Sequence, residues 1–263
     1  MDVLTPRSLE EALQIKGERP DVVPIAGGTD LMVELNFDRR RPEAMLNLGE
    51  VEALRGWSRE NGSLRLAAGL TYTEAMEEPL RSLLPALAEA SRTVGSPQIR
   101  NRGTVGGNLG TASPAGDALP PLLVGDAEVE LASASGSRRL ALDEFLVGPK
   151  CNALAPGELI VAVHIRPSGQ AQTFMKVGPR NAMVIAVCSL ALVADGRRSE
   201  LRAAYGSAGP VAALVTADLA DAETFPDRVA DASRPIDDVR GTAAYRRHAL
   251  RVLTRRALDR CLA

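Results

Sequence analysis

The sequence has few of the side chains from which metal centres and nucleophilic catalytic sites are built. Its 263 residues include three cysteines, Cys151, Cys188 and Cys261, and two histidines, His164 and His248. No Cys-x-x-Cys pair and no close Cys/His cluster occurs, so this chain alone is predicted to form neither a zinc site nor an iron–sulfur cluster. Hydrolase triads and dithiol chemistry are poorly supported for the same reason. If the protein does redox work, it needs an organic cofactor.

Excess charge, long apolar runs and aromatic rings are scarce as well. Lys and Arg number 31 against 33 for Asp and Glu, and the net charge of -2 gives no electrostatic reason to expect a nucleic acid or an anionic membrane as partner. No run of about 18 apolar residues occurs, so no membrane span is predicted. The chain starts MDVLTP, which lacks the pattern of a signal peptide, and we expect a cytoplasmic protein. Hydrophobic residues still make up 45% of the chain, enough for a large core in one or two domains.

The first part of the chain has the hydrophobic pattern of an α/β segment. Ser8 and Glu11 are spaced as a capping box at the start of a helix, and Gly17 marks its end. Farther along, the pattern predicts a buried strand over residues 22–26, a short helix over 30–35 and a second strand over 45–48.

The middle and the end of the chain continue with strands and helices. Expected in the middle are strands over 64–68, 127–132, 139–142 and 159–165, a helical turn over 73–76 and a helix over 80–93. Between Gly95 and Gly116 there are six glycines in 22 residues and no aromatic, so we expect a functional loop there and no packed element. At the end we expect an antiparallel sheet with strands over 173–177, 182–193 and 201–207, then a helix over 241–262.

The first of two glycine clusters lies where a predicted strand meets a helix, with the sequence AGGTDL. Gly27 and Gly28 leave backbone N–H groups accessible because no Cβ stands in the way, and the helix that begins near Asp30 adds positive potential. These are features of a phosphate-binding turn, although a purely structural role is the more common interpretation of such a turn alone. The cluster is not the G-x-G-x-x-G motif, so a Rossmann domain is not predicted.

The second cluster, RGTVGGNLGTASPAGD, begins at Arg102 and is much longer. Its glycines allow close approach of the backbone to a ligand, and Asp117 could accept a hydrogen bond from a ring N–H or a ribose hydroxyl. Two separated glycine turns suit a pyrophosphate held from both sides, whereas a tight surface loop is the structural alternative. Short hydrogen-bonding side chains in this cluster are Thr104, Asn108, Thr111 and Ser113.

Together, these motifs closely resemble those of the FAD-binding subunit of molybdenum hydroxylases, a family that includes xanthine dehydrogenase and carbon monoxide dehydrogenase. The form TASPxxD, which ends at Asp117, is most similar to the xanthine dehydrogenase branch. The resemblance extends over nearly the whole chain, through the sequences ELI at 158–160, FMK at 174–176 with Arg180, and DDVR at 237–240 with Tyr245 and Arg246.

The resemblance implies an α+β fold of the PCMH type, with two α/β subdomains that hold FAD and a C-terminal domain of antiparallel sheet plus helices. We expect these units at residues 1–55, 56–167 and 168–263. The first glycine cluster would lie along the adenosine-diphosphate part, the second would bind the pyrophosphate, and its later residues would approach the ribityl and flavin end. The implied FAD-binding residues are Pro24, Ile25, Ala26, Gly27, Gly28, Thr29, Asp30, Leu31, Thr104, Val105, Gly106, Gly107, Asn108, Thr111, Ser113, Asp117, Leu154 and Lys176.

Two of these residues concern the flavin ring itself, and so does one position at which the sequence departs from the family pattern. The resemblance implies that Leu154 lines the isoalloxazine and that Lys176, close to the ring, could stabilise negative charge on it when reduced. Val94 stands where the family often has a shielding aromatic, so the stacking partner stays open. We interpret Cys188 as buried and inert, and His164 as structural.

The implied function is that of an electron-transfer subunit. Electrons would come from the [2Fe–2S] clusters of a small partner subunit, fed by a molybdopterin-containing large subunit, and would leave FAD for NAD or another acceptor. The scarcity of metal ligands agrees with metals that are held on partner chains. Two alternatives stay open: a stand-alone FAD oxidoreductase of the same fold type, and a non-catalytic nucleotide-binding assembly module.

Overall fold

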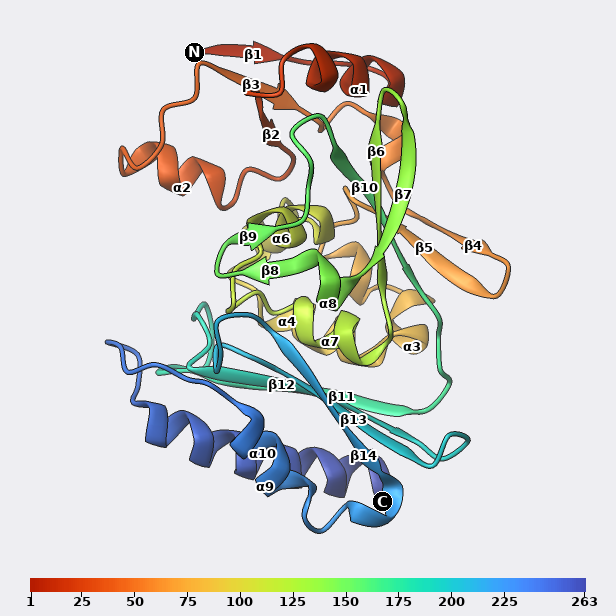
Figure 1. Ribbon diagram of the computed structural model, residues 1–263, viewed down its shortest axis with the longest axis vertical. Coiled ribbons are helices and arrows are strands. Elements are labelled where there is room, and N and C mark those ends of the chain that lie inside the picture. Colours follow the sequence, from red (N-terminus) through yellow and green to blue (C-terminus); the bar gives the residue numbers. More distant parts are fainter.

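The computed structural model describes residues 1–263, and its main sheets are stacked along the long axis of the molecule (Figure 1). A three-stranded sheet lies at the N-terminal end, a five-stranded sheet in the middle and a four-stranded sheet at the C-terminal end. Residues 1–55, 56–167 and 168–263 each contain one of these sheets. The α+β class is confirmed. None of the helices is both long enough and apolar enough to cross a membrane.

The N-terminal part is a parallel sheet with two connecting helices. Its elements are β1 (Asp2–Leu4), α1 (Leu9–Glu18), β2 (Val23–Ile25), α2 (Leu31–Asn36) and β3 (Ala44–Asn47). The strand order is β1-β3-β2, and because parallel strands cannot be joined by a tight turn, the chain passes through α1 and α2 between them. Ser8 caps α1 as predicted, since its Oγ accepts a hydrogen bond from the Glu11 N–H at 3.1 Å.

The middle part combines an antiparallel sheet with short helices. The sheet order is β4-β5-β10-β6-β7, and the central strand is buried at every position. The smaller pair β8–β9 forms a separate ribbon. The elements are η1 (Glu52–Leu54), β4 (Trp57–Glu60), β5 (Ser63–Ala67), η2 (Glu74–Met76), α3 (Leu80–Leu83), α4 (Pro85–Thr93), α5 (Pro97–Arg100), α6 (Val105–Thr111), α7 (Leu119–Val124), β6 (Glu128–Ser133), β7 (Gly136–Ala141), α8 (Leu142–Phe145), β8 (Leu146–Gly148), β9 (Cys151–Asn152) and β10 (Leu159–Ile165).

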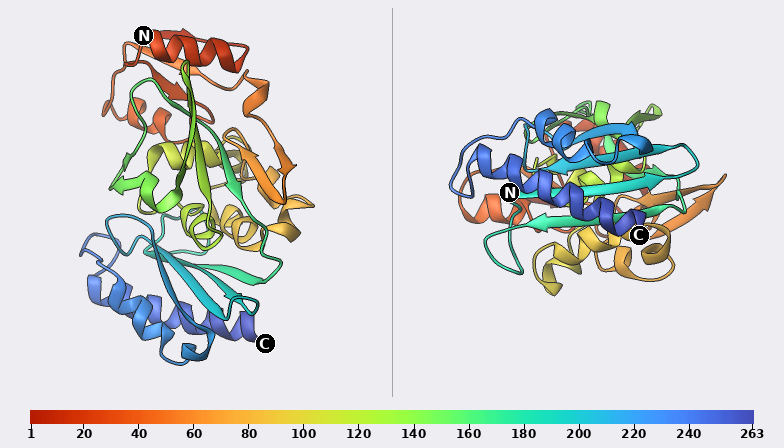
Figure 2. Two further views of the ribbon diagram at one scale, coloured as in Figure 1. Left: turned by 45° about the vertical axis from the view of Figure 1, so that its right-hand side comes forward. Right: turned by 90° about the horizontal axis from the view of Figure 1, so that it is seen from below.

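The C-terminal part is an antiparallel sheet that packs on both faces. Its elements are β11 (Ala171–Val177), β12 (Cys188–Asp195), β13 (Glu200–Gly206), β14 (Ala213–Asp218), η3 (Leu219–Asp221), α9 (Phe225–Ala232) and α10 (Ala243–Leu262). Successive side chains of a strand point to opposite faces. Ala191 and Val193 therefore join the core of the middle part, whereas Leu190 and Leu192 join a second core with residues of α9 and α10. Helices α9 and α10 cover the outer face (Figure 2).

Two segments, one predicted to be helical and one predicted to be a loop, have a different structure. A proline explains the first difference, and a threonine that caps a helix explains the second. The helix expected over 80–93 is broken at Leu84, since Pro85 disfavours a helical backbone at the residue before it and begins α4 instead. The expectation of no packed element between Gly95 and Gly116 is wrong. Thr104 caps α6 by accepting a hydrogen bond from the Gly107 N–H at 2.9 Å, and Val105 and Leu109 on this helix are fully buried.

The strand expected over 182–193 starts only at Cys188. Met183 has a positive φ of 50°, which a regular strand cannot accommodate. Val184 folds back against Gly178, where an added Cβ would come within 2.5 Å of its side chain. Residues before Cys188 therefore form a loop at the end of the sheet, and Val184 and Ile185 of this loop reach the cavity described below.

Candidate functional site

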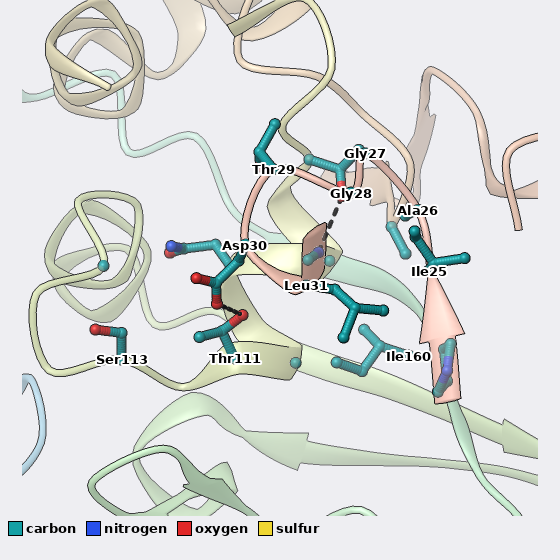
Figure 3. A pocket seen from close by; sticks show the side chains of 18 of the residues that line it. Ile25, Ala26, Gly27, Gly28, Thr29, Asp30, Leu31, Thr111, Ser113 and Ile160 are labelled. Carbon is teal, nitrogen blue, oxygen red and sulfur yellow. Dashed lines mark hydrogen bonds between the residues drawn. The ribbon is translucent and has the colours of Figure 1, made fainter. Parts of the chain in front are cut away.

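One large cavity, of about 710 Å³, lies between the N-terminal and middle parts of the molecule, a volume typical of ligand sites. Its wall includes the β2–α2 turn, the segment around α6, the turn after β9 and the loop before β12. Figure 3 shows polar and apolar regions within it. Asp30, Thr111 and Ser113 lie on one side, and Leu31 and Ile160 lie on the other.

The β2–α2 turn presents free backbone donors to this cavity. The N–H groups of Ala26, Gly27, Gly28, Thr29 and Asp30 donate to no protein atom, and all five residues line the cavity. Gly28 adopts a positive φ of 75°, which turns the chain after β2. Consecutive unpaired N–H groups at such a turn are suited to bind an anion. The phosphate-binding interpretation of the first glycine cluster therefore has a physical basis.

The two glycine clusters are in direct contact. A Cβ added to Gly27 would lie 1.8 Å from the carbonyl oxygen of Arg102, so only glycine allows the two backbones to approach this closely. On the other side of the turn, Thr111 Oγ1 donates to Asp30 Oδ2 at 2.8 Å (Figure 3). The Asp30 side chain makes no capping bond to α2, so its role is to tie the turn to the end of α6.

The N-terminal amides of α6 are already paired within the protein. The N–H of Val105 donates to the carbonyl of Leu70 at 2.9 Å, and that of Gly106 donates to the carbonyl of Ala68 at 2.8 Å. The N–H groups of the next two residues both donate to Thr104. These backbone hydrogen bonds require a glycine at position 106, because a Cβ there would come within 2.6 Å of Ala68. The second cluster thus holds the start of α6 against the segment that follows β5, and it leaves side chains to contact a ligand.

Leu154 is held at the cavity by a network of hydrogen bonds. Its N–H donates to Asn152 Oδ1 at 3.2 Å, and Asn152 Nδ2 donates to the Gly110 carbonyl at 2.9 Å. Glu158 Oε2 accepts from the Ala155 N–H at 2.8 Å, and its carboxylate also pairs with Arg138. The hydrogen bond from Arg138 is the main reason that the pKa of Glu158 lies below its usual value. The turn around Leu154 is therefore fixed to both α6 and the middle sheet.

Asp117 and Lys176 form a buried ion pair at the border of the middle and C-terminal parts. Lys176 Nζ lies 2.5 Å from Asp117 Oδ2, and the two side chains are only 6% and 7% exposed. Lys176 also donates to the Thr93 carbonyl at 3.3 Å. Burial raises the pKa of the Asp117 carboxyl, and the ammonium opposes that rise. Asp117 Oδ1 has no hydrogen-bond partner.

Most of the residues that the sequence assigned to the site line the cavity, but two do not. Val105 is fully buried in the core, and Lys176 lies behind Asp117. The lining residues among those predicted are Pro24, Ile25, Ala26, Gly27, Gly28, Thr29, Asp30, Leu31, Thr104, Gly106, Gly107, Asn108, Thr111, Ser113, Asp117 and Leu154.

Several lining residues were missed in the sequence. Tyr72 contributes the single aromatic ring of the cavity wall, and Ile160 and Ile185 contribute aliphatic surface. Nothing in the local sequence marks Ile160 and Ile185 as ligand contacts, because strands and loops everywhere contain such residues. Gly69 lies in the turn that follows β5, and that strand-to-turn position was the available signal for it, whereas Tyr72 lies farther along and carries no such signal.

The cavity residues fit FAD in their chemistry. Free N–H groups at 26–30 match a pyrophosphate, the unpaired Asp117 oxygen and the hydroxyls of Thr111 and Ser113 match hydroxyl-bearing groups, and aliphatic side chains around Leu154 match a flat apolar ring.

Comparisons with known proteins agree with this assignment. Residues 1–167 match the family described as FAD binding domain in molybdopterin dehydrogenase. The chain is 29% identical to the putative xanthine dehydrogenase FAD-binding subunit XdhB of Escherichia coli strain K12, with 97% of this chain and 94% of the relative covered. It is 31% identical to the nicotine 6-hydroxylase medium subunit of Paenarthrobacter nicotinovorans, with the same coverage. Among solved structures, a chain of reconstituted CO dehydrogenase from Oligotropha carboxidovorans superimposes with a TM-score of 0.92 at 25% identity, covering 99% of this chain and 97% of that one.

Proposed function

Because the chain belongs to the family of FAD-binding medium subunits of molybdenum hydroxylases, we propose that it serves as the electron-transfer subunit of such a complex. FAD, when bound, supplies the two-electron and one-electron chemistry that connects an electron donor to an acceptor. In this proposal a partner subunit with [2Fe–2S] clusters delivers electrons, and NAD or another acceptor removes them. A molybdopterin-containing large subunit completes the complex, which is located in the cytoplasm.

The single observation that carries the proposal is the joined pair of glycine clusters at the cavity. The five unpaired N–H groups of residues 26–30 are the strongest anion-binding feature of the wall, and we assign the pyrophosphate to them. Thr104, Gly106, Gly107 and Asn108 would border the phosphates from the other side. The adenosine part would extend along residues 24–31.

The remaining site residues would hold the flavin half. We assign Thr111, Ser113 and Asp117 to the ribityl chain and flavin, and Leu154 to one face of the ring. Lys176 would act through Asp117, because its ammonium already pairs with that carboxylate behind the cavity wall. The ammonium opposes the rise that burial causes in the pKa of Asp117, so it favours the ionised carboxylate and in this way would influence the charge near the ring.

The specific kinship to xanthine dehydrogenase is a further part of the proposal. It rests on the TASPxxD sequence that ends at Asp117 and on similarity to a protein named as a xanthine dehydrogenase subunit. The same chain is similar to a nicotine 6-hydroxylase subunit at slightly higher identity. The substrate of the complex is chosen on the molybdenum-containing partner, so this chain does not determine it.

A test separates electron transfer from the two alternatives. The full-length protein is purified, its visible spectrum is recorded before and after addition of FAD, and NADH is then added without oxygen. We expect flavin absorption bands that bleach with NADH, together with partner chains that co-purify when the neighbouring genes are co-expressed. The non-catalytic module would be favoured if dithionite bleached the flavin bands but no physiological donor did, and if no partner chain co-purified. Turnover of a small substrate by the isolated chain would favour the stand-alone oxidoreductase.

A further inference from the structure

The sequence DDVR at 237–240 and the arginine that follows it in α10 have no part in the proposed function so far. The carboxylate of Asp238 pairs with two guanidinium groups, that of Arg240 at 2.8 Å and that of Arg246. Arg240 is partly exposed, but Arg246 is only 2% exposed. Arginine is almost never buried to this extent unless it is paired. The loop before α10 therefore holds a buried guanidinium in a fixed orientation.

Arg246 connects this loop to Ser207, the residue that directly follows β13. Its Nη2 donates to Asp238, while its Nη1 donates to the carbonyl of Ser207. Ser207 is buried and has a positive φ of 58°. A residue other than glycine adopts this conformation at a cost, and it persists only where surrounding contacts enforce it. The hydrogen bond from Arg246 is one of these contacts.

The other two polar groups of Ser207 reach two separate segments of the cavity wall. Its N–H donates to the Pro114 carbonyl at 2.7 Å, and its Oγ donates to the Ala186 carbonyl at 2.9 Å. Pro114 follows Ser113 and Ala186 follows Ile185, and both of these preceding residues line the cavity. Ser207 thus joins the turn at Ser113 to the loop at Ile185 from behind the wall, without lining the cavity itself.

Both joined segments belong to the side of the cavity that we assign to the flavin half. The proposed function places Ser113 at the ribityl chain and flavin. Ile185 lies beside it through their common contact with Ser207, and its side chain is 61% exposed although it lines the cavity, so it is open to contact by an apolar ring. Neither segment is part of the β2–α2 turn, to which we assign the pyrophosphate.

We propose that Arg246 and Ser207 are positioning residues, which hold the turn at Ser113 and the loop at Ile185 at a fixed separation and so preform the flavin half of the cavity. Segments that are already ordered need not lose conformational freedom when a ligand binds, and this increases affinity. The inference rests on the proposed placement of FAD. It gives the DDVR sequence a role at the cofactor site, although none of its residues lines the cavity.

The test compares FAD with ADP, which lacks the flavin half. Apo-protein of the full chain is titrated calorimetrically with both ligands, for wild type and for Ser207→Ala. The variant loses the bond to Ala186 and keeps both backbone contacts of Ser207, so the ligand must now order the loop at Ile185. We expect FAD binding to weaken roughly three- to tenfold and ADP binding to stay the same. The visible circular dichroism of bound FAD at saturation should also change, because it reports on the surroundings of the ring.

Arg246→Met tests the origin of the constraint. It leaves the Ser207 carbonyl without its donor and should weaken FAD binding at least as much as Ser207→Ala, again with ADP binding unchanged. Thr254→Val is the control, because it removes another buried hydroxyl from the same helix. Thr254 Oγ1 donates to the Leu250 carbonyl at 2.8 Å, away from the cavity wall, so its loss should leave both affinities unchanged whatever its effect on thermal stability.

Two results would separate a failure of this inference from a failure of the proposed function. Ser207→Ala with unchanged FAD affinity and an unchanged dichroism spectrum, or with an equal loss of affinity for ADP, would overturn the inference and leave the placement of FAD intact. A wild-type chain that binds FAD no better than ADP would overturn the placement of the flavin half, and the inference with it.

Discussion

At the scale of single residues, the site depends on two neighbouring glycines that act in different ways. Gly28 supplies a backbone angle that other residues adopt only at a cost, and the space around it would admit a Cβ in ordinary contact at 3.4 Å. Gly27 has no such angle but faces the Arg102 carbonyl, where a Cβ would overlap at 1.8 Å. One glycine shapes the turn, and the other allows two segments far apart in sequence to touch.

This difference predicts that Gly27→Ala is more damaging than Gly28→Ala. The first change forces two backbones apart and should lower the free energy of unfolding by about 3 kcal/mol or more, the upper end for overpacking. The second should lower it by about 1 to 2 kcal/mol through its positive φ. Urea unfolding of the apo-protein measures both. Gly62→Ala is the control, because Gly62 has a φ of 81° and nothing within 4 Å of an added Cβ, so it reports the backbone cost alone. Equal losses at Gly27 and Gly28 would contradict the proposed contact between the clusters.

The residues that could be found from the sequence were those whose type is unusual at its position. Gly27, Gly28 and Asp117 stand out because a Gly-Gly step where a strand meets a helix, and a carboxylate in a glycine-rich run, are conspicuous in the sequence, although a Gly-Gly turn alone is more often structural. Tyr72 and Asn152 could not be found, since each is a common residue whose role comes from a neighbour brought close by folding. The paired amides of α6 were unpredictable for the same reason, because their acceptors belong to the segment after β5.

At the scale of elements, chain segments around the cavity gain order from side-chain contacts. A run rich in glycine was expected to stay irregular, yet Thr104 provides a cap and Gly106 allows the helix to pack closely against Ala68, just after β5. Propensity alone therefore underestimated α6, because tertiary packing overrides it. Strands with an alternating or continuous apolar pattern, in contrast, were predicted, whereas β1, β4, β8, β9 and β14 were not. Buried strands such as β10 carry this signal in every residue.

The turn that carries Leu154 gives a prediction about pH. The pKa of Glu158 is lowered in the folded protein by Arg138 and by the Ala155 N–H, so its contribution is present above the unfolded pKa near 4.3 and is lost as pH falls through the folded value. Glu158→Gln should therefore lower the free energy of unfolding by about 1 kcal/mol at pH 7, and by less at pH 3 to 4. Urea unfolding across this pH range measures the difference.

The control for this element is Glu52→Gln. Glu52 pairs with Arg55 at 3.5 Å, but its side chain is 85% exposed, so the change should have little effect at any pH. A difference between Glu158→Gln and wild type that stays constant from pH 7 to pH 3 would show that the carboxylate charge is not what holds the turn. Both variants keep the shape of the side chain, which limits the comparison to charge and hydrogen bonding.

At the scale of the whole molecule, the C-terminal sheet is continuous with the core of the middle part. Phe174, Ala191, Val193 and Ala204 from this sheet belong to the same apolar cluster as β10 and α7. Polar contacts cross the border too: the Ser207 N–H donates to the Pro114 carbonyl at 2.7 Å, within the segment that leads to Asp117. The wall of the cavity near Asp117 therefore depends on the C-terminal part as well as on the glycine clusters. The division of the chain into three units could be proposed from the sequence, but these contacts between units could not, because they join residues without a shared pattern.

The buried pair of Lys176 and Asp117 spans this border, and its loss should show a distinctive dependence on pH. Lys176→Met leaves an unpaired buried carboxylate, which we expect to cost about 3 to 5 kcal/mol at pH 8. The pKa of Asp117, already raised by burial, would rise further without the ammonium. A carboxyl whose pKa is higher in the folded than in the unfolded protein destabilises the fold above that folded value, and the effect disappears as pH falls towards the unfolded one. The deficit of Lys176→Met should therefore shrink between pH 8 and pH 5, as measured by urea unfolding of the apo-protein.

Two further variants make this prediction specific to burial. Lys176→Met combined with Asp117→Asn removes both charges, so the double variant should be more stable at pH 8 than Lys176→Met alone and should have a deficit that hardly changes with pH. Lys150→Met removes an ammonium of the same type from a surface pair with Glu34 at 3.2 Å, where the lysine is 59% exposed, and should change stability by less than about 1 kcal/mol. If Lys176→Met lost equal stability at pH 5 and pH 8, the carboxylate would not be the group left uncompensated. The link between the C-terminal part and the cavity would then rest on the hydrogen bond from Ser207 to Pro114 and on the packing of Phe174, in place of the ion pair.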